Sequence, residues 1–228
     1  MFRRLCWMTL IATLWAGTVH GGTDRVSRAS RIVASMDYIP FTSIKDGCYA
    51  RALYMGMELT VNRIPSSNQY IFGKLRPRGA AWKWHVAPLV EDPASGRVRV
   101  LDPSLAPRPL RRNDWIRRSA PRNRPLLAMA PVSQYKKKEV RPQARPVIRH
   151  TPVRSLRQLP GFRMADIASA CRVAWVHIGK ERLSMTGIRR KRQRLERRTD
   201  QLVRRLIRMG KLPGGSGLLE CSSASFRT

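Results

Sequence analysis

One cysteine of the sequence lies where a thiol could act as a nucleophile. Cys48 stands inside the stretch Asp-Gly-Cys-Tyr-Ala-Arg-Ala. Apolar residues follow it at helical spacing: Ala50, Leu53, Met57 and Val61. We expect Asp46 to be the N-cap and Gly47 to let the chain turn, so that Cys48 lies in the first turn of a helix. The free amides and the positive dipole end there favour a negatively charged sulfur. The alternative is that Cys48 is a small buried residue inside the helix.

A histidine and an aspartate further along the chain supply the other parts of a thiol triad. Residues 82–90 are rich in aromatic and branched side chains and predict a strand, residues 98–102 predict another, and Pro93 lies in the turn between them. In such a hairpin His85 lies opposite Asp102 or within two residues of it. Cross-strand neighbours are about 5 Å apart at Cβ, so the carboxylate could hold the imidazole. Nucleophile, base and orienting acid are then all present.

The elements that must position this triad are a helix followed by a hairpin. The order of the motifs predicts an α+β fold, with the Cys48 helix packed on the antiparallel sheet that carries His85 and Asp102. Trp82 and Trp84 lie two residues apart just before His85, so we expect both on the strand face opposite His85, packing the sheet against the helix.

Three motifs together resemble bacterial protein glutaminases, which are secreted protein deamidases with a papain- and transglutaminase-like core. They are the Cys48 stretch, the Trp-x-His-Val-Ala strand and Leu-Asp-Pro-Ser-Leu after it, and the resemblance covers residues 38–116. It implies Cys48 as nucleophile, His85 as general base and acid, Asp102 as the residue that orients His85, and Trp115 as an anchoring aromatic. The chain departs from the pattern at Leu53, where relatives often carry a histidine.

The resemblance also implies the reaction. Cys48 would attack the carboxamide carbon of a protein glutamine, release ammonia and leave a thioester that water hydrolyses to glutamate. No cofactor is expected, and the partners are proteins with exposed glutamine. A transglutaminase or a cysteine protease would use the same three residues. A further alternative is a non-enzymatic basic protein that binds nucleic acid or acidic membrane surface.

Charge divides the chain into two unlike parts. The sequence of 228 residues has a net charge of +31. Residues 1–104 hold 14 lysines and arginines against 7 acidic residues, whereas residues 105–228 hold 31 against 7. We therefore expect the catalytic domain to span residues 22–118, with most of the basic charge beyond it.

The first residues predict export. Arg3 and Arg4 precede an apolar run too short to span a membrane, and small residues follow. We interpret residues 1–21 as a signal peptide and expect a secreted or periplasmic protein.

The second half predicts an extension with little structure of its own. Residues 119–160 combine recurring proline with arginine and predict an extended linker, in which the run Leu126 to Val132 is the part expected to dock. Residues 161–228 predict a basic, partly disordered helical tail, with helices over 164–178 and 189–209. The helices could pack on each other, or the second could bind acidic membrane or nucleic acid. We expect a truncation near Arg118 to keep turnover.

The remaining cysteines and histidines predict no metal site. Cys171 and Cys221 could form a disulfide in an oxidising compartment. The four histidines show no zinc-type spacing with cysteine, and no glycine-rich phosphate loop is present in the sequence.

Overall fold

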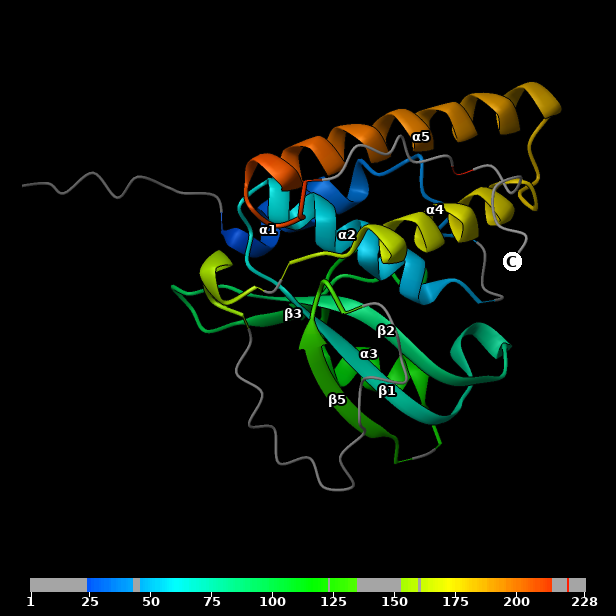
Figure 1. Cartoon of the computed structure of the whole chain (residues 1–228). Coiled ribbons are helices and arrows are strands. Elements are labelled where there is room, and N and C mark those ends of the chain that lie inside the picture. Colours follow the sequence, from blue (N-terminus) through cyan, green and yellow to red (C-terminus); the bar gives the residue numbers. More distant parts are fainter. Residues whose placement is uncertain are drawn as a thin grey trace, which may run out of the picture.

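In the described part of the chain, four α-helices lie on one face of an antiparallel sheet and one α-helix lies on the other. It was determined as a computed structural model that describes residues 24–42, 46–122, 124–134, 153–159, 161–214 and 221. Helices α1, α2, α4 and α5 lie above the sheet, and α3 lies behind it (Figure 1). The mixed helix and antiparallel sheet architecture confirms the predicted fold class. The signal segment, residues 1–21, lies outside the described residues.

The sheet has five strands in the order β4-β3-β2-β1-β5, all antiparallel to their neighbours. Their bounds are β1 Ser67–Leu75, β2 Trp82–Glu91, β3 Val98–Val100, β4 Leu110–Arg111 and β5 Leu126–Pro131. β2 and β3 are the predicted hairpin. Leu89 pairs with Val100, and this register puts Asp102, just after β3, within two residues of the position opposite His85. The predicted pairing is confirmed.

A bulge near the start of β2 turns one tryptophan away from its expected face. Phe72 pairs with Trp84, but Leu75 pairs with Trp82, so β1 carries one extra residue between the two pairs. A one-residue slip moves a side chain to the other face of a sheet. Trp84 stays on the face of α2 and stacks on Tyr49 at 5.8 Å. The prediction that Trp82 also lies there is wrong, because Trp82 meets the His85 ring at 4.6 Å between centroids.

Helix α2 (Cys48–Val61) is the centre of the fold. All of its residues except Tyr49 are buried. A helix buried all round must be covered on every side. The sheet covers one side through Tyr70 and Val86, and α1 (Arg25–Ala34), α4 (Met164–Ile178) and α5 (Met185–Arg208) cover the rest.

The two C-terminal helices form at the predicted places but do not make a separate tail. Their apolar residues share one buried cluster with α1 and α2, including Ile167 and Ala170 of α4 and Leu202 and Leu206 of α5. The predicted packing of the two helices on each other is therefore found, and α2 is part of the same packing. Because the apolar stripe of α5 is buried in this cluster, it is not available for insertion into a membrane. Its arginine-rich opposite face remains exposed.

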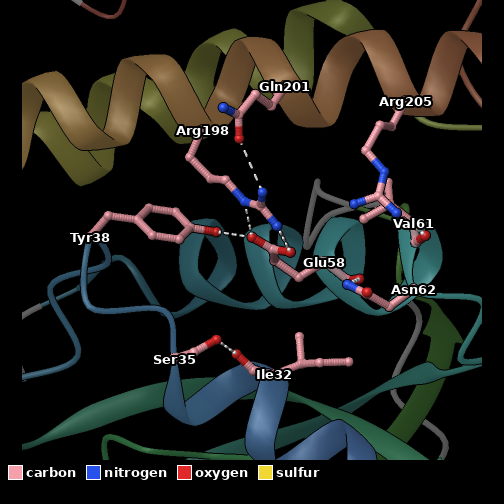
Figure 2. Close-up of polar contacts among 9 residues, drawn as sticks. All are labelled: Ile32, Ser35, Tyr38, Glu58, Val61, Asn62, Arg198, Gln201 and Arg205. Atoms are coloured by element: carbon pink, nitrogen blue, oxygen red, sulfur yellow. Dashed lines mark hydrogen bonds and ion pairs between the residues drawn. The ribbon is translucent and has the colours of Figure 1, made fainter.

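One buried carboxylate ties α5 to α2. Glu58 of α2 accepts two hydrogen bonds from Arg198 of α5, both of 2.6 Å, and a third of 2.6 Å from Tyr38 (Figure 2). Glu58 is 3% exposed. Arg205 of α5 also donates to the carbonyl oxygen of Val61 at the end of α2. Part of the positive charge of the C-terminal region thus neutralises a buried negative charge.

The predicted division at residues 118, 119 and 160 does not match the packing. β5 belongs to the predicted linker, yet it pairs with β1 along six residues of the sheet. The part of the linker at 135–152 lies outside the described residues. Cys171 of α4 forms a disulfide with Cys221. The sequence suggested separate regions because arginine and proline dominate their composition, but the apolar residues between them complete the core of α2.

Helix α3 (Arg112–Ser119) covers the opposite face of the sheet. Trp115 is fully buried there with Ile71, Leu89 and Val100. Within the ranges described above, no helix has the length and apolar character to cross a membrane.

Candidate active site

Cys48 is the first residue of α2, as predicted, but the cap is not the predicted one. Gly47 is the N-cap, with φ of 80°, and Asp46 is also left-handed, with φ of 63°. The Asp46 side chain accepts a hydrogen bond of 2.7 Å from the Gly47 amide instead of capping the helix. Glycine is required at position 47 because its φ is positive and a Cβ there would lie 3.0 Å from Nε2 of His177.

A helix of the C-terminal region therefore touches the turn that presents the cysteine. His177 and Val173 of α4 both approach Gly47. His177 is buried, and burial together with the charges of Arg51 and Lys180 lowers its pKa. No sequence signal pointed to His177, because it lies about 130 residues from Cys48 in the chain.

His85 and Asp102 form a buried pair. Nε2 of His85 lies 2.6 Å from Oδ2 of Asp102. The two residues are 1% and 5% exposed. The indole N–H of Trp115 donates to the same oxygen at 2.8 Å, and the Ser104 hydroxyl donates to Oδ1 at 2.5 Å. The carboxylate is thus held by three donors, and the Trp115 ring stacks on His85 at 5.6 Å.

The electrostatics of the pair favour a charged imidazole and a charged carboxylate. Burial lowers the pKa of His85, but the charge and hydrogen bond of Asp102, with smaller contributions from Cys48, raise it to about 9. Burial raises the pKa of Asp102, but His85, Ser104 and Trp115 together lower it below its usual range. Each group therefore stabilises the charged form of the other.

The cysteine lies on the remaining side of the imidazole. Since Nε2 is bound to Asp102, Nδ1 is the nitrogen left for proton transfer. Nδ1 is buried and has no hydrogen-bond partner of good geometry among the described residues, and the Cys48 thiol is near enough to act on the pKa of His85. The structure thus brings the three predicted residues together in the order cysteine, histidine, aspartate.

Arg51 also lies at the site, although the sequence predicted no role for it. It lies one turn after Cys48 and is 4% exposed. Its Nη1 donates to the carbonyl oxygen of Asp46 at 3.2 Å, which braces the left-handed turn. Burial lowers the pKa of Arg51, and negative charge at Cys48, Asp102 and Asp46 works against that shift. The sequence shows Arg51 in the motif around Cys48, but it does not show that the Arg51 side chain is buried.

Of the two side chains that donate to Asp102 beside His85, the sequence indicated Trp115 more clearly than Ser104. Trp115 was expected as an anchoring aromatic, and its hydrogen bond to Asp102 shows what it anchors. Ser104 stands two residues after Asp102, where a hydroxyl can reach the preceding carboxylate.

A cavity of about 520 Å³ opens at the sulfur. Cys48, Asp46, Trp82, Lys83 and Trp84 line it. The tryptophans give it apolar walls, and its size suits an amino-acid side chain. Among the described residues, no group of three or more histidine, cysteine, aspartate or glutamate side chains could hold a metal ion.

A buried histidine–aspartate pair beside a cysteine at the start of a helix, in an α+β fold, is typical of thiol hydrolases. A family model described as glutaminase matches residues 24–119, which contain all three residues. This segment is similar to the glutaminase family, as its motifs predicted. The match supports protein deamidation as the general activity and a deamidating hydrolase as the class of enzyme.

Solved protein-glutaminase structures are also similar to the chain. A crystal structure of protein-glutaminase is 24% identical, covers 52% of this chain and 76% of its own, and has a TM-score of 0.43. The NMR structure of protein-glutaminase from Chryseobacterium proteolyticum is 28% identical over 47% of this chain and 65% of its own, with a TM-score of 0.39. A crystal structure of pro-protein-glutaminase is 25% identical over 54% of this chain and 51% of its own, with a TM-score of 0.42. The comparison with curated proteins finds no match.

Proposed function

We propose that the protein deamidates glutamine side chains of proteins to glutamate and releases ammonia, with Cys48 as nucleophile, His85 as base and acid, and Asp102 as the residue that orients His85. The observation that carries this proposal is the buried His85–Asp102 pair, with a bond of 2.6 Å, beside a cysteine at the first position of α2. All three lie inside the segment that matches the glutaminase family.

The first half of the reaction starts from an ion pair in which His85 already holds the thiol proton on Nδ1, as its raised pKa favours. The Cys48 sulfur then attacks the carboxamide carbon. The tetrahedral oxyanion accepts hydrogen bonds from backbone amides, among them that of Cys48, because the first amides of a helix have no intrahelical acceptor. His85 then returns a proton to the nitrogen. The carbon–nitrogen bond breaks, ammonia leaves, and a thioester to Cys48 remains.

In the second half, water resolves the thioester. His85 removes a proton from water, which attacks the thioester carbonyl, and the carbon–sulfur bond breaks to give glutamate and the free thiol. Throughout, Asp102 keeps the proton of the imidazole on Nε2 and stabilises the imidazolium. Trp82, which lies against the His85 ring, shields the imidazole from bulk water.

We also propose that the protein is exported. The positive start and short apolar run of residues 1–21 support a signal peptide. The Cys171–Cys221 disulfide supports an oxidising compartment. Fractionation of cells that express the full chain tests this: a shortened protein outside the cytoplasm is expected, and a full-length protein in the cytoplasm would contradict export.

Ammonia release from an unfolded, glutamine-rich protein tests the proposed activity. The full chain should release ammonia without shortening the substrate or cross-linking it, and Cys48→Ala should release none. Cleaved substrate would identify a cysteine protease, and cross-linked substrate a transglutaminase. A folded protein that modifies no substrate would leave the non-enzymatic binding protein as the better description.

A further inference from the structure

A second and larger hollow adjoins the cavity at Cys48. Its volume is about 950 Å³. Ala81, Trp82 and Lys83 line both hollows, so the two adjoin at the start of β2, and the larger is lined further on by the end of β1 and by Pro121. We call the larger hollow the distal groove.

The distal groove is shaped by elements that the fold holds in place. The bulge in β1 contributes Gly73, whose φ of 137° suits glycine. The Arg76 amide donates to the Ser119 carbonyl oxygen at 2.9 Å, which joins the end of β1 to the end of α3. Pro121, which follows α3, lines the distal groove together with Trp82.

The charge of the distal groove has one sign. None of the described residues that line it is acidic, and four of them are basic: Lys74, Arg76, Lys83 and Arg122. All four side chains are exposed. Asp46, which is acidic, lines the smaller hollow at Cys48. The positive charge therefore lies on one side of Cys48, in the distal groove.

We propose that the distal groove binds the substrate chain on one side of the glutamine and selects acidic side chains there; this rests on the proposed deamidation. An extended peptide advances about 3.3 Å per residue, so the residues next to the glutamine enter the groove when its side chain reaches Cys48. Trp82 and Pro121 contact the apolar parts of the peptide, and the basic side chains pair with its carboxylates.

The net charge of +31 gives a competing source of preference for acidic substrates. Long-range attraction depends on the total charge of a peptide and is indifferent to which side of the glutamine carries it. The distal groove is one-sided. The order of residues in the peptide therefore separates the two effects.

The test compares two peptides of equal composition, with two glutamates either before or after one glutamine, and a parent with two alanines. We expect kcat/KM for ammonia release to be about tenfold higher for one acidic peptide than for the other at low salt, with the difference reduced by added salt. Equal values of kcat/KM for the two acidic peptides would contradict the proposal that the distal groove selects acidic side chains. No release from any peptide would overturn the deamidation and the groove together.

Paired variants locate the effect. Arg76→Gln with Arg122→Gln removes two charges that line only the distal groove, and should reduce the ratio between the acidic peptides to less than about threefold. The matched control, Arg197→Gln with Arg204→Gln on the exposed face of α5, removes the same charge and should keep the ratio. An unchanged ratio in the first pair, with the same melting temperature as wild type, would contradict the assignment.

Discussion

The segment of residues 24–119 and the C-terminal helices α4 and α5 contribute in different ways to one core. The first holds Cys48, His85, Asp102 and their hydrogen-bond partners. The second covers the outer side of α2 and touches the turn before Cys48 through His177. Changes to Cys48, His85, Asp102 and their hydrogen-bond partners should therefore reduce turnover without unfolding the protein, and changes to the contacts between α2 and the C-terminal helices should reduce stability. The difference shows that the motif around Cys48 can be recognised in the sequence, whereas the helices that support it cannot, because charged residues dominate their composition.

The largest expected effect comes from removing the second region. A chain that ends at Arg118 lacks β5, α4 and α5, and exposes the apolar residues of α2 that they bury. It also leaves the buried Glu58 without Arg198. The structure reverses the expectation from sequence: this chain should not fold, as circular dichroism and hydrogen exchange would report. A soluble, folded truncation with turnover would show that α4 and α5 are dispensable.

The next effect lies in the first region and is kinetic. Asp102→Asn should lower kcat about a thousandfold, because asparagine cannot stabilise the imidazolium or hold its tautomer. In wild type, kcat/KM should fall as pH rises through about 9, where His85 loses its proton. In the variant this fall should move to lower pH.

The same pKa gives a stability prediction. Since the pKa of His85 is raised to about 9 in the folded protein, its contribution to stability is complete below the unfolded value of about 6.5 and is lost as pH rises through 9. The measurements are a pH–rate profile and urea unfolding at several pH values. The same profile in wild type and Asp102→Asn would contradict the pairing.

A smaller effect is expected where α5 meets α2. Arg198→Ala leaves the Glu58 carboxylate with Tyr38 as its remaining partner in the cluster of Figure 2. Because the Arg198 side chain is 31% exposed, water can replace part of the pair, and we expect a loss of about 2 kcal/mol in the free energy of unfolding. The adjacent, exposed Arg197→Ala is the matched control, and should change stability by less than about 0.5 kcal/mol. Equal losses would show that Arg198 has no special role.

The smallest effect concerns one hydrogen bond between the regions. The Thr199 hydroxyl of α5 donates to the Leu195 carbonyl at 2.7 Å, so the Tyr54 hydroxyl of α2, also at 2.7 Å, donates to Thr199. Tyr54→Phe should cost about 1 kcal/mol. Urea unfolding measures the cost, and turnover at 25 °C should stay at the wild-type level. A loss of turnover without a loss of stability would instead tie Tyr54 to the residues around Cys48.

The sequence was sufficient to place Cys48 and to pair His85 with Asp102, because both placements follow from local rules. A helix after Gly47 fixes Cys48, and a short hairpin fixes His85 relative to Asp102. The bulge between Phe72 and Leu75 was not predictable, because pairing of β1 with β2 decides which strand takes the extra residue. For this reason the sequence predicted Trp82 on the wrong face of the sheet.

The role of the C-terminal helices was not predicted, because the many arginines in their sequences obscure the spacing of their apolar residues. The sequence of α2 did contain a signal. From Leu53 to Leu59 its only charged residue is Glu58, so α2 has no broad polar face to meet solvent. Such a helix requires a second covering layer, and the apolar positions of residues 164–178 and 189–209 were the available partners.

The origin of the new oxygen in the product tests the central claim most directly. Wild-type protein is incubated with a glutamine-containing substrate in water labelled with heavy oxygen, and the substrate is analysed by mass spectrometry. If water resolves a thioester on Cys48, each converted glutamine becomes glutamate and carries one heavy oxygen, while the Cys48→Ala variant converts none. Conversion by Cys48→Ala at the wild-type rate, or glutamate without heavy oxygen, would contradict the account.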